Sequence, residues 1–357
     1  MSDIATKLAY LNETKNLIKQ AIIDKGVTVS DTDTFRSYAD KISSITNTLP
    51  STVATDDVCR KNLCYWMDAI EHSGVIDIDG TVNTNSWWSK IGFNYFTPYN
   101  GSATTPWNND SVTLSSSYHG VKETTPMMYS MASNIKEVTY EMTFSVNSYT
   151  TTASFILGNL QAGGSGILYD PDGVFYLAYF PDGTQVWWAP DSNLHKTELN
   201  QKVYVCGRIK QGSLSLYSTC SGVITNKEFT ETLKLLLTAP MTVGYNGSAS
   251  GAYDSQQANI NVNSFRVYNR YITDEEMLAN CKYEVDRFNI PEYRILTINS
   301  NVEGATVTLT ADGYTQTDNY IKVLKGTEVA YSVSADGYTT QTGTIKVNDT
   351  QTIDITL

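Results

Sequence analysis

The stretch Phe265–Asn280, FRVYNRYITDEEMLAN, joins a strand directly to a helix. From Asn261 to Tyr268 polar and apolar residues alternate with a period of two, which predicts a half-buried strand. Thr273 is a good N-cap, and Glu276 three residues later completes a capping box. A short helix is therefore expected to begin here and to continue through Val285.

Residues 57–290, which include this stretch, consist mostly of short strand-like segments separated by Gly, Asn, Asp and Pro. The expected strands are Leu63–Ala69, Glu137–Val146, Ser154–Leu160, Val174–Phe180, Gln185–Ala189, Lys202–Ile209, Ser213–Thr219, Met241–Tyr245 and Ile260–Tyr268. Turn signals stand between them at 171–173, 181–183 and 211–212. Many short strands at such spacing predict a β-sandwich.

The stretch 265–280 also resembles the closing strand and helix of laminin-G-like, concanavalin A-type jelly-roll domains. The resemblance implies a jelly roll over residues 57–290. Because such domains often bind glycans, it also implies a lectin-like role for this part of the chain.

The composition of the 357 residues suits two or three domains with ordinary cores, since 41% of the residues are hydrophobic. A net charge of −12 argues against a nucleic-acid partner, which would need clustered Lys and Arg. No apolar run is long enough to span a bilayer, and the polar N-terminus does not suggest a signal peptide. The five cysteines show no metal-binding spacing and are expected to be free thiols of a protein folded in a reducing cytoplasm: Cys59, Cys64, Cys206, Cys220 and Cys281.

Residues 1–48 are predicted to be helical, and residues 49–56 to be a polar linker. One apolar stripe includes positions seven residues apart, a heptad spacing that favours assembly of helices. Two small helices bury too little to be stable alone. They are expected either to pack as a hairpin within the chain or to self-associate. An assembly of two to four chains fits the heptad pattern. The candidate oligomerisation residues are Ile4, Leu8, Leu11, Ile18 and Ile22.

Residues 291–357 are predicted to form a small antiparallel β-sandwich with an internal echo. The pentapeptide ADGYT occurs at 311–315 and again at 335–339. This module resembles PEGA domains, in which a segment like EGATVTL at 303–309 precedes a DGY turn. It departs from the usual motif in one position, because Val302 stands where the family has proline before the glutamate.

The N-terminal stretch Leu11–Ile42, LNETKNLIKQAIIDKGVTVSDTDTFRSYADKI, is similar to the opening segment of many bacteriophage tail and virion proteins. Together with a lectin-like jelly roll and a PEGA-like module, it implies a phage tail-fibre, baseplate or head-fibre protein. The same resemblance implies a homotrimer, attachment to other virion proteins through the N-terminal helices, contact with the host surface and location in the virion.

Paired carboxylates would be the sign of a glycan-cleaving enzyme on a jelly roll. Such enzymes need two carboxyl groups roughly 5 to 9.5 Å apart. The nearest candidates, Glu137 and Glu141, share one face of a predicted strand but should lie about 13 Å apart along it. We therefore expect a solvated outer strand face there and no catalytic residues.

Aromatic residues are the better functional signal. The segments 174–179 and 185–188 are expected to pair across the 181–183 turn, with one tryptophan on each face. Sugars stack on exposed aromatic rings beside polar anchors, as in apolar ligand sites generally. The candidate glycan-binding residues are Tyr176, Tyr179, Trp187, Trp188 and Asn246.

No cofactor or metal is expected. Asp170, Asp172 and Asp182 lie in or beside two Pro-Asp-Gly turns, and turn formation explains these residues. The alternative is that their carboxylates bind a calcium ion.

The sequence thus predicts a non-enzymatic virion fibre or tail-associated protein that adheres to host surface glycan. Two alternatives stay open at this point: a purely structural decoration subunit without a ligand, and a glycan depolymerase on the same fold.

Overall fold

The computed structural model describes residues 7, 14–16, 18–19, 29–30, 33–34, 37–38, 41, 62–69, 75–76, 82–83, 87–90, 95–98, 108–115, 120–123, 137–159, 164–180, 184–190, 194–233, 241–248, 251–253 and 256–357. The chain divides into two compact units, Met1–Asp57 and Val58–Leu357. Within the described ranges, every helix is too short or too polar to cross a membrane.

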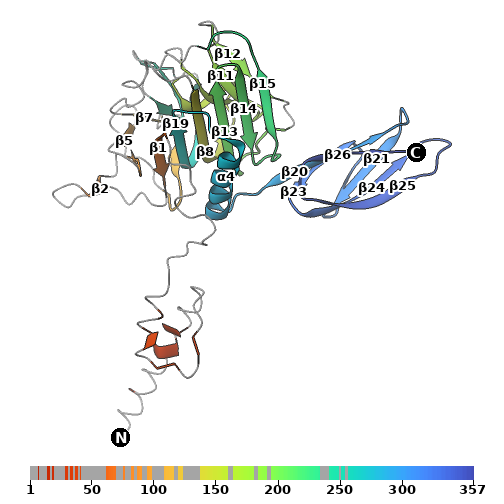
Figure 1. Ribbon diagram of the computed structural model, residues 1–357, viewed down its shortest axis with the longest axis horizontal. Coiled ribbons are helices and arrows are strands. Elements are labelled where there is room, and N and C mark those ends of the chain that lie inside the picture. Colours follow the sequence, from red (N-terminus) through yellow and green to blue (C-terminus); the bar gives the residue numbers. More distant parts are fainter. Residues whose placement is uncertain are drawn as a thin grey trace. The chain divides into compact units, whose positions relative to one another are not determined.

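Two antiparallel sheets form the sandwich in the larger unit (Figure 1). The first sheet has the order β1 (Leu63–Asp68), β19 (Asn259–Tyr268), β8 (Glu137–Ser148), β13 (Lys202–Lys210), β14 (Ser213–Ser218) and β15 (Ile224–Glu228), and β6 (Val112–Leu114) pairs with β19. The second has the order β12 (Val186–Trp188), β11 (Phe175–Tyr179), β10 (Gly166–Tyr169), β9 (Ser154–Gly158), β16 (Thr242–Val243), β7 (Val121–Glu123), β5 (Tyr95–Pro98) and β4 (Trp87–Trp88). Two small hairpins pair β2 (Val75–Ile76) with β3 (Val82–Asn83), and β17 (Asn246–Ser248) with β18 (Gly251–Tyr253).

The predicted fold class, a mainly β protein with a jelly-roll-type sandwich, is confirmed. Each strand expected between residues 57 and 290 has a counterpart, with ends that differ by a few residues. The sequence patterns missed β10, β15, β17 and β18, and they gave no individual strands for the region of β2 to β7, between residues 70 and 135. Glycines at 163, 164 and 166 are typical of a turn and obscured β10, and the edge strand β15 is too polar to stand out.

Aromatic rings packed edge to face fill one end of the core between the two sheets. Phe96 and Phe265 lie 5.2 Å apart between ring centroids, and Trp87 and Phe265 lie 5.3 Å apart. In the middle of β13, a residue larger than Gly207 would collide with the opposite sheet, because its Cβ atom would lie 2.3 Å from Cδ2 of Leu177. The sandwich therefore needs close packing of its two sheets at this point.

The helix α4 (Asp274–Phe288) follows β19 and covers the outer face of the first sheet (Figure 1). The predicted capping box is confirmed: Thr273 Oγ1 accepts from the backbone N–H of Glu276 at 3.2 Å, and the Glu276 carboxylate accepts from the N–H of Thr273 at 2.8 Å. Such a cap stabilises a helix by about 1 kcal/mol. Asn289, in a left-handed conformation, ends the helix.

The prediction of a half-buried strand at 261–268 is wrong. Residues from Val262 to Tyr268 are buried on both faces of β19, because α4 lies over the face that would otherwise meet solvent. Ser264, Arg266 and Tyr268 are the polar members of that covered face.

The C-terminal residues form two further sheets around their own apolar core. One has the order β23 (Tyr320–Leu324), β20 (Tyr293–Ser300) and β26 (Gln351–Ile355), and the other β22 (Tyr314–Gln316), β21 (Thr306–Ala311), β24 (Thr327–Ser334) and β25 (Gln341–Val347). An antiparallel sandwich was expected. The sequence pattern did not reveal that β20 and β26 pair in parallel.

Few residues of the N-terminal unit are described. Helical residues occur at 14–16 and 18–19, and half-buried Ile18 packs against buried Val29 and Tyr38 of the same chain. Among the oligomerisation candidates, Ile4, Leu8, Leu11 and Ile22 lie outside the described residues. The one described candidate, Ile18, therefore contacts its own chain, as in the hairpin alternative.

Candidate functional site

The pairing of β11 with β12 decides where the predicted glycan-binding aromatics lie. Trp187 stands opposite Ala178, whereas Trp188 stands opposite Leu177 and Val186 opposite Tyr179. Residues opposite each other in a ladder share a face of the sheet. Leu177 and Tyr179 belong to the core between the sheets, so Trp187 lies on the outer face of the second sheet.

Tyr176 lies on the same outer face as Trp187, because it is two residues from Ala178 on β11. With Phe180 it is half-buried and packs around the buried residues Phe155, Leu168 and Ala178. Trp187 itself is 42% exposed on the edge strand β12. Tyr176 and Trp187 are thus diagonal neighbours on an apolar outer face, the β11–β12 face, which consists of Phe155, Leu168, Tyr176, Ala178, Phe180 and Trp187.

The other two aromatic candidates lie on the inner face. Tyr179 is only 2% exposed and packs on Phe229, with ring centroids 5.3 Å apart. Trp188 is partly buried against the core. Tyr179 therefore has almost no surface to offer a ligand, and the structure does not bring it together with Trp187.

Asn246, the polar candidate, begins β17, which contacts β9 and β16. Its side chain lies outside what the structure describes. Its predicted contact with glycan stays a prediction.

The carboxylate of Asp170 organises the turn between β10 and β11. One oxygen accepts the backbone N–H groups of Asp172 and Val174, each at 2.9 Å, and the other accepts the hydroxyl of Tyr176 at 3.0 Å. Burial, together with this bond to Asp170, raises the pKa of Tyr176. Asp170 is thus used in turn formation, and it fixes the ring of Tyr176 on the β11–β12 face.

The described residues contain no group of three or more His, Cys, Asp or Glu side chains arranged to hold a metal ion. Asp182, the carboxylate of the second Pro-Asp-Gly turn, lies outside the described residues.

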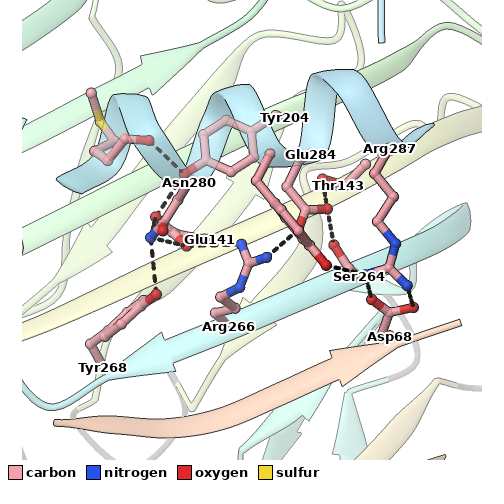
Figure 2. A network of polar contacts seen from close by, with 12 residues as sticks. Asp68, Glu141, Thr143, Tyr204, Ser264, Arg266, Tyr268, Asn280, Glu284 and Arg287 are labelled. Atoms are coloured by element: carbon pink, nitrogen blue, oxygen red, sulfur yellow. Dashed lines mark hydrogen bonds and ion pairs between the residues drawn. The ribbon is translucent and has the colours of Figure 1, made fainter. Parts of the chain in front are cut away.

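A second cluster of polar side chains lies between α4 and the first sheet (Figure 2). Glu141 accepts hydrogen bonds from Tyr204 at 2.7 Å and from Asn280 at 2.9 and 3.1 Å. Arg266 bridges the two carboxylates of the cluster: it lies 3.4 Å from Glu141 and also donates to Glu284. Glu284 further accepts from Thr143 at 3.0 Å and from Ser264.

This network is almost completely enclosed. Glu141 and Arg266 are 1% exposed, and Glu284 is fully buried. Burial raises the pKa of Glu141 against the opposing effect of Arg266. Beside the network, Arg287 forms a two-pronged ion pair with buried Asp68 on β1. The contacts join α4 to β1, β8, β13 and β19, and their role is to hold the helix on the sheet.

The expectation of a solvated face at Glu137 and Glu141 is therefore wrong for Glu141. It failed because the sequence gives no direct sign that α4 covers β8. A signal was present in the helix itself, where the buried stripe Met277, Cys281 and Phe288 also includes Asn280 and Glu284. Polar residues on the apolar stripe of a helix indicate buried polar partners on the surface beneath it.

Comparison with protein families matches residues 293–357 to the model of the PEGA domain. The predicted resemblance of the C-terminal module to PEGA domains is thereby confirmed. No curated protein matches the chain.

Solved structures similar to the chain include two kinds of protein. One is a Trypanosoma rangeli sialidase in complex with sialic acid, with 14% identity and a TM-score of 0.46; the match covers 65% of this chain and 34% of the sialidase. The other is the receptor-binding domain of botulinum neurotoxin mosaic serotype C/D, with 10% identity and a TM-score of 0.45, covering 77% of this chain and 71% of that domain. The matched part of the chain thus spans about a third of the sialidase.

Proposed function

We propose that this chain is a virion fibre or tail-associated protein that adheres to host cell-surface glycan through the β11–β12 face of its sandwich. The observation that carries the glycan site is the exposure of Trp187, the large aromatic residue that the described part of the sandwich leaves open to solvent. The similarity of residues 11–42 to phage virion segments supports the location on the particle.

The chemistry of the β11–β12 face suits a sugar. An exposed indole offers a flat apolar surface for the apolar side of a pyranose ring, and its N–H remains available to a hydroxyl group. Tyr176 extends the apolar surface, and its hydroxyl is already held by Asp170, so its ring orientation is fixed before a ligand arrives. A site that is ordered before binding loses less entropy when it binds.

The burial of the paired carboxylates favours glycan binding without hydrolysis. Glu141 and Glu284, two carboxylates held by one arginine, are sealed beneath α4. None of the described hollows is lined by either of them. A substrate could not reach them without removal of the helix.

Replacement of Trp187 by alanine tests the proposed site. The full chain is titrated with purified host surface polysaccharide by calorimetry, and reducing ends are measured in the same samples. We expect saturable binding by the natural chain, no release of reducing ends, and at least about tenfold weaker binding by Trp187→Ala, because loss of a stacking aromatic residue typically has an effect of this size.

The matched control is Leu199→Ala, because Leu199 is a similarly exposed large apolar residue (45%) elsewhere on the sandwich. Its binding should equal that of the natural chain. Release of reducing ends would support the depolymerase instead. Absence of any binding would favour a decoration subunit, and equal binding by Trp187→Ala would move the site away from this face.

The N-terminal unit is proposed to join copies of the chain, as a trimer, and to attach them to other virion proteins. Introducing charge with Leu11→Asp and Ile18→Asp should convert the oligomer to monomers while the β-sheet circular dichroism spectrum is kept. Native mass spectrometry measures the change. Asn16→Asp introduces one such charge at an exposed position and should leave the oligomer mass unaltered. An unchanged mass for the double variant would count against assembly through this segment.

A further inference from the structure

Two adjoining hollows lie at one end of the PEGA domain. The first, of about 590 Å³, is lined by Glu303, Gly304, Ser334, Asp336 and Thr340 among others. The second, of about 540 Å³, lies against the same loop and includes Asn299, Asn319 and Asp354. Val302 and Gly304 line both hollows, so the loop 302–304 separates two halves of one polar depression.

Strand pairing places this depression at the end of the domain opposite the point where the chain enters it. β20 begins at Tyr293 and ends at Ser300, which pairs with Ile355 near the end of the parallel strand β26. Thr306 at the start of β21 pairs with Ser334 at the end of β24. The loop 302–304 and the turn 335–340 therefore meet at one end.

The carboxylates of the depression are available to a ligand. Among the described residues, no cation forms an ion pair with Glu303 or Asp336. The hollow beside α4 is different, because its cations are already neutralised: Lys282 pairs with Asp286 at 2.7 Å, and Glu292 pairs with Arg294 at 2.8 Å and Lys325 at 3.3 Å. That hollow leaves few charges free to bind.

Two exposed tyrosines are close in the sequence to residues that line the depression. Tyr338 is 51% exposed and follows Asp336 in the same turn. Tyr320 is 36% exposed and follows Asn319, which lines the second hollow. A depression lined by carboxylates without a cation and by amide and hydroxyl groups, with exposed tyrosines next to its lining residues in the sequence, has the chemistry needed to bind a polyol.

We propose that this end of the PEGA domain is a second saccharide-binding site, separate from the β11–β12 face and independent of the function proposed for it. Glu303 and Asp336 accept hydrogen bonds from hydroxyl or ammonium groups of the sugar, and Tyr338 contacts the ring. Because three carboxylates, Glu303, Asp336 and Asp354, line the depression and none of them pairs with a described cation, neutral and amino sugars are favoured and anionic sugars are repelled.

The test uses the full chain carrying Trp187→Ala, so that the β11–β12 face does not contribute. The labelled protein is applied to a glycan array that carries neutral, amino-sugar and sialylated oligosaccharides. We expect binding to neutral or amino-sugar glycans and none to sialylated ones. Adding Tyr338→Ala, or Glu303→Gln with Asp336→Asn, should reduce the bound signal at least about tenfold.

The internal repeat supplies the matched control. Tyr314 occupies the equivalent place in the first ADGYT turn and is 62% exposed, but it follows β21 and so lies at the other end of the antiparallel sheet. Adding Tyr314→Ala to the Trp187→Ala chain should leave the signal unchanged.

The proposal is overturned if the Trp187→Ala chain binds no neutral or amino sugar on the array, or if Tyr314→Ala and Tyr338→Ala reduce binding equally. Equal thermal unfolding temperatures for all variants exclude loss of the fold as the cause. A failure here would leave the polysaccharide titration of the natural chain unaffected, so the two proposals are distinguishable.

Discussion

Replacing Arg266 with alanine is expected to lower the free energy of unfolding by about 3–5 kcal/mol at neutral pH. Arg266 is the shared partner of two buried carboxylates, Glu141 and Glu284 (Figure 2). Without it, both negative charges remain in a region of low dielectric constant with only neutral donors around them. Truncation of the long side chain also leaves an empty space beneath α4, because Arg266 packs against the ring of Trp66.

The penalty should become smaller as the pH falls. Burial already raises the pKa of Glu141, and removal of the positive charge raises it further, so the carboxylates of the variant take up protons more readily. Urea unfolding followed by circular dichroism at about pH 5 and pH 7 measures this. If the penalty is equal at both values, the carboxylates are not the source of the instability.

Lys282→Ala is the matched control on the same helix. Lys282 forms an exposed pair with Asp286 one turn away, and such pairs contribute about 0.3–0.5 kcal/mol. A variant with Arg266→Met, Glu141→Gln and Glu284→Gln should recover much of the loss, because it removes all three buried charges together. A loss as small as that of Lys282→Ala would show that α4 does not depend on the network.

Alkaline solution is expected to unfold the protein, with a steep loss of stability above about pH 9. Burial raises the pKa of the thiols of Cys206, Cys220 and Cys281, to about 12 for Cys281, and it likewise raises the pKa of the phenols of Tyr140 and Tyr204. In the unfolded chain these groups ionise near their ordinary values of about 8.5 for Cys and about 10 for Tyr.

The sign follows from proton binding. Between the unfolded and the folded pKa, the folded state keeps a proton that the unfolded state has released. The stabilisation is therefore complete below the unfolded pKa and is lost as the pH rises toward the folded value. Each group contributes at most about 1.4 kcal/mol per pH unit, and several together approach the 5–15 kcal/mol of a whole domain.

Urea titrations at pH 8, 9, 10 and 10.5 measure the slope, and a thiol reagent added at pH 8 measures exposure. The four described cysteines, Cys64, Cys206, Cys220 and Cys281, are buried and should react only after unfolding. Cys281→Ala is less stable at every pH but should show a shallower decline above pH 9. A free energy of unfolding that stays constant from pH 8 to pH 10 would contradict the burial of these groups.

The strands and the capped helix could be predicted because their signals are local. The period-2 pattern of β19 and the Thr273–Glu276 capping box depend on neighbours within a few residues, and the structure has a strand and a capped helix at these positions, although the strand is buried on both faces. The ADGYT echo likewise marked two turns correctly, with Gly313 and Gly337 in the left-handed conformation that such turns require.

The candidate glycan site could be predicted only in part. The turn at 181–183 and the alternation of 185–188 correctly implied that Trp187 and Trp188 lie on opposite faces. Which of them faces outward depends on which face of β11 meets the other sheet. That choice buries Tyr179 and leaves Trp187 exposed.

Local signals in the sequence were enough to predict the succession of elements: the strands, the turns between them, the capped helix after Tyr268 and the β-rich C-terminal residues. These follow from hydrophobic period, capping and turn chemistry, which act between residues close in the chain. Three features could be seen only in the folded protein: α4 lies over the first sheet, the side chains of Glu141, Arg266 and Glu284 meet, and loop 302–304 faces the turn at 335–340. Each of these contacts joins residues far apart in the sequence, and burial of charge depends on what finally covers it.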